Sequence, residues 1–206
     1  MVTELGGTGI QHELSIIRSV DTDIPRFRSA IHRIGLHLAV AVSARLSSDP
    51  CTVTTPLATI ESQRIHGNII LVPVLRAGLG LLQAFLDIFP DARVGFHGLR
   101  RNEQTLQPAE YYSRFPATTL QTTMIVLDPM LATAGSMRAT IQHLQRLPHH
   151  KMMAACIIGA PEGKALMEQE HPAVDVVVAA LDSHLNPHGF IVPGLGDAGD
   201  RLFGAD

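Results

Sequence analysis

Cysteine is scarce in this sequence, which contains two, Cys51 and Cys156. Neither belongs to a CxxC pair or to the Cys/His spacing typical of zinc sites, so no cysteine-based metal site is indicated. The eleven histidines are scattered along the chain. The adjacent His149 and His150 would point in different directions on a helix or a strand. We therefore expect no metal site built from protein side chains alone.

Clustered positive charge is missing too. The net charge is −3, the isoelectric point is about 6.4, and no run of Lys and Arg occurs. Because binding to a phosphate backbone needs clustered basic residues, we expect no nucleic-acid partner. No apolar run is long enough to cross a membrane, and the N-terminus lacks the basic flank and apolar centre of a secretory signal. The sequence predicts a soluble, cytoplasmic protein with no membrane partner.

What the sequence does contain is apolar residues, 46% of a 206-residue chain. This predicts one domain over residues 1–206 with a large core. Apolar strand patterns alternate with helical patterns, which indicates an α/β fold with a mostly parallel sheet flanked by helices. The expected strands are 69–74, 92–95, 123–127, 152–159 and 174–180, and the expected helices are 25–44, 81–88, 136–147 and 161–170.

Four segments have no clear place in that alternation. They are a loop at 47–50, a weak or edge strand at 51–60, a long polar loop at 100–120 and an irregular, Gly-rich tail at 189–199. The tail also holds apolar residues, so we expect it to pack as a small structured lobe. Loops as long as 100–120 in compact domains usually have a function.

The most informative segment is MIVLDPMLATAGS at 124–136. An apolar strand ends at Asp128, and a turn of small residues precedes a helical pattern. The N-terminus of a helix favours an anion, and a carboxylate at the end of a parallel strand is placed for a sugar hydroxyl or a metal. A phosphorylated sugar would use both features. The alternative is an ordinary turn whose helix is capped by Ser136.

Three other segments could bind ligands. In VPVLRAGLG at 72–80, Arg76 offers a planar fork for phosphate oxygens, or is an ordinary surface residue. Arg100 and Arg101 could close over a polyanion, or belong to a solvated hairpin. GLGDAG at 194–199 matches GxGxxG, but the seven residues that follow cannot complete a dinucleotide-binding unit. Its free backbone groups could instead read a flat polar ring, with Asp197 adding a carboxylate.

Taken together, these segments closely resemble the uracil phosphoribosyltransferases, which have the type I phosphoribosyltransferase fold. The matching stretches are VPVLRAGLG at 72–80, RNEQT at 101–105, YYSRFP at 111–116, VLDPMLATAGS at 126–136, APEG at 160–163 and GFIVPGLGDAGDRLFG at 189–204. The resemblance covers about residue 69 to the end and is weaker before it. It implies a glycosyltransferase that converts uracil and phosphoribosyl pyrophosphate (PRPP) to UMP and pyrophosphate.

The resemblance also implies the residue roles. Those for PRPP are Arg76, Arg101, Asp128, Pro129, Met130, Leu131, Ala132, Thr133, Ala134, Gly135, Ser136 and Asp197. Those for uracil are Ile191, Gly196, Asp197 and Ala198, and those for catalysis are Asp128, Asp197 and Arg101. Mg²⁺ would bind mainly through PRPP, the C-terminal tail would be the base-binding lobe, and the chain would form a homodimer or a higher homo-oligomer. GTP is a candidate effector.

Some positions depart from the family pattern. Ala134 stands where the family usually has Gly, Arg100 stands where an aromatic residue is common, and Glu13 and Ala41 replace a basic and an acidic residue. Two other functions therefore stay open: a weakly active paralogue that senses PRPP or a nucleotide, and the same chemistry on another nucleobase. For Ala134 we expect a negative φ, because natural sequences seldom place strain in a phosphate loop.

Overall fold

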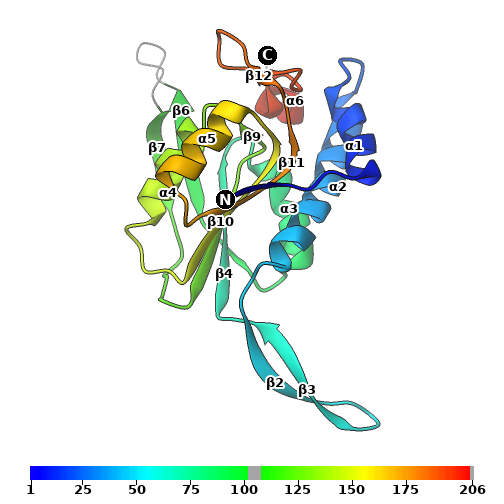
Figure 1. The fold of residues 1–206 in the computed structure, drawn as a ribbon, viewed down its shortest axis with the longest axis vertical. Helices are drawn as coiled ribbons and strands as arrows, with labels where there is room; N and C mark the ends of the chain where they lie inside the picture. Colours follow the sequence, from blue (N-terminus) through cyan, green and yellow to red (C-terminus); the bar gives the residue numbers. More distant parts are fainter. Residues whose placement is uncertain (102–107, 205–206) are drawn as a thin grey trace.

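The computed structural model describes residues 1–101 and 108–204, apart from the side chains of Arg101 and Pro108. Its main sheet has the strand order β1-β11-β10-β8-β4-β6-β7, with β5 beside β4 and β9 beside β10 (Figure 1). These strands are β1 Val2–Glu4, β4 Asn68–Leu75, β5 Arg93–Val94, β6 Phe96–Arg101, β7 Pro108–Arg114, β8 Thr122–Leu127, β9 Met130–Leu131, β10 Lys151–Gly159 and β11 Asp175–Leu181. Apart from the antiparallel β6–β7 pair, the described strand pairs of this main sheet are parallel. The expected fold class is confirmed.

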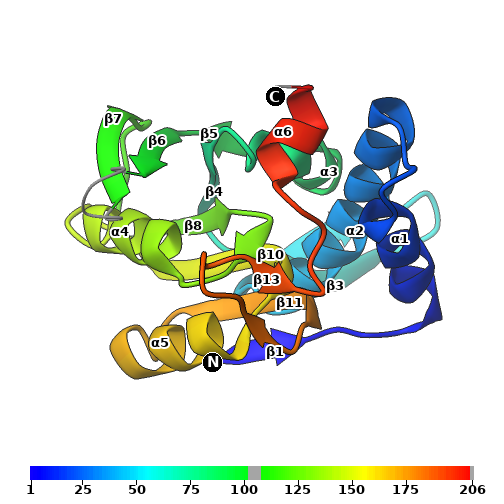
Figure 2. The same ribbon diagram turned by 90° about the horizontal axis from the view of Figure 1, so that it is seen from above.

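Helices cover both faces of this sheet (Figure 2). One face carries α1 Thr8–Arg18, α2 Ile24–Ser43 and α3 Leu79–Ile88, and the other carries α4 Gly135–Leu144 and α5 Pro161–Glu170. Successive side chains of a strand point to opposite faces. Leu71 therefore packs in the core beneath α2 and α3, whereas Ile70 and Val72 pack in the core beneath α4.

The central strands are apolar along their whole length because both of their faces are covered. All the residues of β8 are buried, as are all those of β10 after Lys151. Such continuous apolar runs are typical of parallel strands between two helix layers. The helix over 25–44 was also predicted, and Asp23 sets its start by accepting a hydrogen bond from the backbone N–H of Arg26 at 2.8 Å.

Residues 48–65 form a hairpin that extends away from the sheet (Figure 1), made of β2 Ser48–Thr54 and β3 Thr59–Ile65. The prediction of a loop at 47–50 was wrong, and the weak or edge strand predicted at 51–60 is instead two strands separated by a turn. Pro50 is tolerated because a two-stranded ribbon has open edges on both sides. The turn lies at 55–58, where the Thr55 hydroxyl accepts hydrogen bonds from the N–H groups of Leu57 and Ala58.

The prediction of one long loop at 100–120 was also wrong. Strands β6 and β7 form an antiparallel hairpin there, as the alternative for this segment predicted. Arg100 is exposed near the end of β6. In the RNEQT motif, residues 102–105 lie outside the described residues. Strand β1 was not predicted, and it pairs with β11 at the edge of the sheet. Among the described residues, the structure contains no helix that is both long and apolar enough to span a membrane.

The C-terminal lobe, residues 182–204, lies above the carboxyl ends of the parallel strands (Figure 1). It contains the two-stranded pair β12 His184–Leu185 and β13 Ile191–Val192, followed by the short helix α6 Ala198–Phe203. Ile191, Leu195 and Ala198 are buried in the core beneath α2 and α3. The expected structured tail is therefore confirmed, and it is positioned to cover the strand ends.

Candidate active site

A cavity of about 300 Å³ opens at the carboxyl ends of the strands. Three parts of the chain line it: the segment between β8 and α4, the turn after β4, and the C-terminal lobe. The lining residues are Ala77, Asp128, Met130, Ala132, Thr133, Gly135, Ser136, Gly189, Phe190, Ile191, Gly196, Asp197, Ala198 and Gly199. The structure thus brings most of the sequence-predicted site residues into one cavity.

The phosphate loop, residues 128–136, ends at the N-terminus of α4. This helix begins at Gly135, and its N-cap residue Ala134 makes no side-chain capping bond. The alternative of a helix capped by Ser136 was therefore wrong. The first N–H groups of a helix have no partner within the helix, and the helix dipole makes this end positive. The open end of α4 can accordingly bind an anion such as a phosphate.

Ala134 has φ 61° and ψ 9°, in the left-handed region. The expectation of a negative φ was wrong. The chain must reverse between β9, which pairs with β10, and the start of α4, and a left-handed residue makes that turn. Ala134 is 4% exposed and packs in the same core as Leu131 and Met137. This packing offsets part of the strain, which is roughly 1–2 kcal/mol for a residue with a Cβ.

The side of the loop that faces away from the cavity is fixed by its neighbours. The Pro129 carbonyl accepts a hydrogen bond from the N–H of Ile157 at 2.9 Å, and the Leu131 carbonyl accepts one from Ala160 at 2.9 Å. Helix α5 also approaches closely, because a Cβ at Gly163 would lie 2.4 Å from the Ala132 carbonyl oxygen. Pro129, Leu131 and Ala134, which were expected at the PRPP site, are buried and do not line the cavity. They shape the loop rather than its binding surface.

Asp128 is the buried carboxylate of this site, with 8% of its surface exposed. Its burial raises the pKa of the carboxyl group to about 7, and a hydrogen bond from the Met130 N–H at 3.5 Å opposes the rise. A carboxylate with so little solvation gains when a ligand brings hydroxyl donors to it. Asp128 is therefore suited to bind neighbouring hydroxyl groups of a sugar.

Two charged residues lie where α6 meets the turn after β4. Asp197 caps α6 by accepting a hydrogen bond from the Asp200 N–H at 2.9 Å, and it lines the cavity. Arg76 follows a cis peptide bond and donates to the Asp200 carboxylate at 3.1 Å. Its side chain is 56% exposed just outside the lining. Exposed ion pairs are weak, so an anionic ligand can recruit Arg76. The Arg101 side chain lies outside the described part of the chain.

Comparison with known proteins places this geometry in a family. A family model described as uracil phosphoribosyltransferase matches residues 7–205. The chain belongs to the uracil phosphoribosyltransferase family. It is 46% identical to a uracil phosphoribosyltransferase of Symbiobacterium thermophilum and 44% identical to one of Macrococcus caseolyticus, in both cases over 95% of this chain and 94% of the relative.

Solved structures share the fold of this chain. The AQ2163 protein from Aquifex aeolicus superposes with a TM-score of 0.93 at 34% identity, covering 100% of this chain and 99% of that one. A hypoxanthine phosphoribosyltransferase from Staphylococcus aureus superposes with a TM-score of 0.54 at 9% identity, covering 77% and 76% of the two chains. The second likeness shows the shared fold alone.

In this member of the uracil phosphoribosyltransferase family, distant residues hold the C-terminal lobe in place. Arg18 on α1 makes two hydrogen bonds to the Asp182 carboxylate, at 2.6 and 2.8 Å, and one to the Gly194 carbonyl at 2.9 Å. Asp182 in turn accepts from the Gly194 N–H at 2.9 Å. Gly194 has φ 64°, and a Cβ there would lie 2.1 Å from the Ile191 carbonyl oxygen.

A second arginine, which belongs to the lobe, also links the lobe to α1. Arg201 on α6 donates to the backbone carbonyls of Ile17 and Ser19, and its guanidinium carbon lies 4.3 Å from the centre of the Phe27 ring. The sequence alone indicated no role for Arg18, Asp182 or Arg201. No local pattern could reveal them, because more than 160 residues separate the partners in Arg18–Asp182 and Arg201–Ile17.

Proposed function

We propose that the chain transfers the phosphoribosyl group of PRPP to uracil, giving UMP and pyrophosphate. One observation carries this proposal: a single cavity joins an uncapped helix N-terminus and a buried carboxylate to the backbone of a Gly-rich lobe. The first two features suit a sugar phosphate, and the third suits a flat polar base. Membership of the uracil phosphoribosyltransferase family supports the same reaction.

In this proposal the phosphate loop binds PRPP. The N–H groups at the start of α4, together with Thr133 and Ser136, hold the 5-phosphate, and Asp128 holds the ribose hydroxyls. Arg76 exchanges its exposed contact with Asp200 for the pyrophosphate. Arg101 is assigned to the pyrophosphate by family resemblance. Pro129, Leu131 and Ala134 support the loop from its buried side.

Uracil binds on the lobe, where Ile191 and residues 196–198 present main-chain groups. The backbone is held rigidly there, because the lobe is fixed to α1 and Asp197 caps α6. Rigid N–H and C=O groups discriminate between bases, because a mismatched partner leaves a buried group without a hydrogen bond.

The reaction needs no protein nucleophile. The bond between the anomeric carbon and the pyrophosphate oxygen breaks, uracil N1 forms a new bond to that carbon, and N1 loses its proton. Positive charge develops on the sugar, so catalysis rests on positioning and on charge stabilisation. Asp128 and Asp197 are the carboxylates lining the described cavity. Asp197 is the nearest candidate to receive the proton.

Mg²⁺ is the cofactor in this proposal, and it binds mainly through the oxygens of PRPP. The two carboxylates of the cavity suit it, because Mg²⁺ prefers oxygen ligands and usually keeps several from water and substrate phosphates. When bound, the ion neutralises the charge of the departing pyrophosphate.

The proposal also includes a single catalytic domain over residues 1–206 and a homodimer or higher homo-oligomer. Both described cores pack against the same sheet, which supports one domain. The β2–β3 hairpin supports association, because it exposes Val53, Leu57 and Ile60 and unpaired strands invite pairing. GTP is retained as a candidate effector from the family resemblance alone.

A pyrophosphate-release assay tests this function. Purified protein is mixed with PRPP, Mg²⁺ and uracil, cytosine, hypoxanthine or guanine in turn, with and without GTP. Turnover with uracil is the expected result. Turnover only with another base would support the alternative of the same chemistry on a different nucleobase. Tight PRPP binding without turnover would support the PRPP-sensing paralogue, which the strained backbone at Ala134 motivates.

A further inference from the structure

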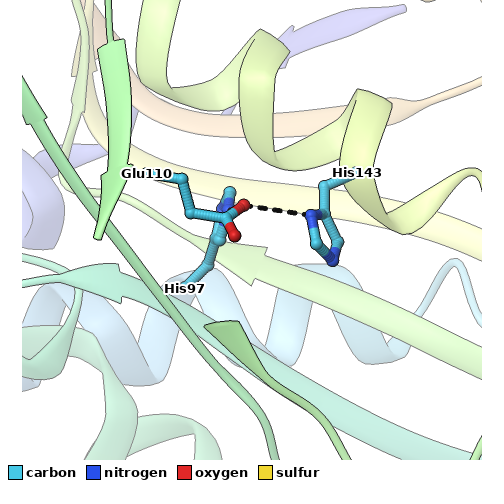
Figure 3. A group of neighbouring side chains, drawn as sticks. All are labelled: His97, Glu110 and His143. Atoms are coloured by element: carbon cyan, nitrogen blue, oxygen red, sulfur yellow. Dashed lines mark hydrogen bonds and ion pairs between the residues drawn. The ribbon is translucent and has the colours of Figure 1, made fainter. Parts of the chain in front are cut away.

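Away from the cavity, two histidines and a glutamate from three different elements meet. His97 lies on β6, Glu110 on β7 and His143 near the end of α4, and one metal-binding atom from each lies within 4.8 Å of the others. Figure 3 shows the Glu110 carboxylate pointing to the space between the two imidazole rings. Its Oε2 is 2.9 Å from His97 Nε2 and 3.1 Å from His143 Nδ1.

We infer that His97, Glu110 and His143 form a binding site for a divalent transition-metal ion of the zinc class, separate from the Mg²⁺–PRPP site. Two imidazoles and one carboxylate form a ligand set that zinc binds in other proteins, with a fourth position left for water. Zinc lies about 2.0–2.2 Å from nitrogen and oxygen ligands, so ligand atoms in a tetrahedral site are about 3.3 Å apart. The two distances to Glu110 are close to that spacing.

The hydroxyl groups around the two rings support the assignment. The second nitrogen of His97, Nδ1, lies 2.8 Å from the Thr140 hydroxyl, and that of His143, Nε2, lies 3.3 Å from the Ser113 hydroxyl. Metal-bound histidines usually donate their other ring N–H to an oxygen acceptor, which fixes the ring and the tautomer, and a hydroxyl oxygen can accept this bond. Because the hydroxyls contact the outer nitrogens, the inward nitrogens, His97 Nε2 and His143 Nδ1, can exchange their contacts with Glu110 for the ion.

The surroundings allow an ion to enter and to be held. His97 is 1% exposed and fixed, while the side chains of His143 and Glu110 are 28% and 45% exposed and can adjust. The Phe115 ring lies 6.1 Å from the His97 ring and 5.3 Å from the His143 ring, centre to centre, and forms an apolar wall. Nitrogen ligands disfavour Mg²⁺. The Mg²⁺ that accompanies PRPP should not compete for this site.

An ion here would connect the base of the β6–β7 hairpin to α4, the helix that begins at the phosphate loop. The ligands come from both hairpin strands and from the helix, so binding should oppose separation of the three elements. Because the ion binds the folded state, zinc should raise the melting temperature (Tm), and the rise should continue with the logarithm of the free zinc concentration above the Kd.

The test is a Co²⁺ titration of the protein without a histidine tag, after treatment with a chelator and in excess Mg²⁺. We expect one equivalent of Co²⁺ to bind with the visible absorption of a tetrahedral site, and Zn²⁺ to displace it and raise the Tm. His143→Gln and Glu110→Gln, both at partly exposed positions, should abolish the signal. Thr140→Val keeps the side-chain shape and should weaken binding about 10–100-fold.

The matched control is His66→Gln. His66 also contacts a carboxylate, Asp49, at 2.8 Å and a second histidine ring, His150, at 4.8 Å between centres. His66→Gln should leave the Co²⁺ signal unchanged. The inference fails if the wild-type protein gives no tetrahedral signal, or if His66→Gln removes the signal while His143→Gln does not. Pyrophosphate release with PRPP and uracil is scored separately, so failure of this site leaves the proposed reaction standing.

Discussion

The phosphate loop and the C-terminal lobe line the same cavity but are held there in different ways. The loop runs from β8 to α4 and contains the short strand β9. Its carbonyls accept hydrogen bonds from N–H groups of β10 and of Ala160 just after β10. The lobe is fixed to α1 and to the residue after it by Arg18 and Arg201, whose bonds join residues more than 160 positions apart in the sequence. Binding of the sugar phosphate should therefore depend on local sequence, and binding of the base on contacts between the two ends of the chain.

The largest expected effect is discrimination between bases. Uracil presents an acceptor at O4 and a donor at N3, and cytosine reverses both. If the lobe reads them with rigid backbone groups, two mismatches of about 1–3 kcal/mol each should favour uracil at least about thirtyfold in kcat/KM. Steady-state kinetics with both bases measures this ratio. A ratio under about ten would mean that side chains or water, rather than the backbone, contact the base.

The structure also suggests which variants test backbone reading. Ala198 is the first residue of α6, where proline fits the backbone and removes one N–H. Ala198→Pro should therefore keep the fold, weaken uracil binding about 5–150-fold for a loss of 1–3 kcal/mol, and spare PRPP binding. Ile191 is 5% exposed in the core, so Ile191→Ala would leave a cavity. Ile191→Val is the milder control and should change uracil binding little.

The next effect concerns Asp128 in the phosphate half of the cavity. Asp128→Asn keeps the shape and removes hydrogen bonds to a charged group, each worth about 1.5–3 kcal/mol. We expect kcat/KM for PRPP to fall roughly ten- to a hundredfold or more. The circular dichroism spectrum should stay unchanged. Near-wild-type kinetics would show that Asp128 does not bind the ribose.

The same variant should have the opposite effect on the stability of the ligand-free protein. Burial raises the pKa of Asp128 to about 7 in the folded state, whereas an unfolded Asp has a pKa of about 3.9. The folded protein thus holds a proton that the unfolded chain has lost, and stability falls as the pH rises from about 4 to about 7. Asp128→Asn removes this loss. Its Tm advantage over the wild type should be larger at pH 8 than at pH 5.

These two halves of the cavity also differ in how far the sequence could predict them. The apolar strand, Asp128 and the small residues before α4 are adjacent in sequence, so their joint placement followed from periodicity and from the sheet-edge rule. The sign of φ at Ala134 did not follow, because it depends on the pairing of β9 with β10 and on packing against Met137.

The remaining features depend on contacts between residues far apart in the sequence. The strands of the β2–β3 hairpin carry no alternation of buried and exposed residues, because both of their faces are largely exposed. Arg18, Asp182 and Arg201 each look like ordinary charged residues until the lobe folds back onto α1. His97 and His143 meet only because the β6–β7 hairpin packs against α4.

A smaller effect tests the connection between the chain ends. Arg18→Gln removes a two-pronged bond to Asp182, whose side chain is 4% exposed. Bonds to charged groups are worth about 1.5–3 kcal/mol, so the protein should lose stability of that order. KM for uracil should rise while the affinity for PRPP stays close to that of the wild type. An equal loss of affinity for uracil and for PRPP would contradict the idea that the lobe and the phosphate loop are held in place independently. The double variant Arg18→Gln/Asp182→Asn should recover part of the stability that Arg18→Gln loses, because no unpaired buried charge is left.

The smallest effect is expected at Ala134, the residue of the phosphate loop whose backbone is strained. With φ at 61°, relief of a cost of roughly 1–2 kcal/mol should outweigh the extra flexibility of glycine in the unfolded chain, about 0.4–1 kcal/mol. Ala134→Gly should therefore gain up to about 1 kcal/mol, a rise in Tm of about 2–4 °C at most, and should bind PRPP more tightly because the loop adjusts to the phosphate.

The matched control is Ala139→Gly, the same substitution in the interior of helix α4. Inside a helix glycine costs about 0.5–1 kcal/mol relative to alanine, so this variant should lose stability and leave PRPP affinity unchanged. Calorimetry gives Tm and PRPP titration gives the affinity for both variants. If Ala134→Gly behaves like Ala139→Gly, the packing of the Ala134 methyl group is worth more than the strain. The phosphate loop would then be stabilised by the same residue that departs from the family pattern.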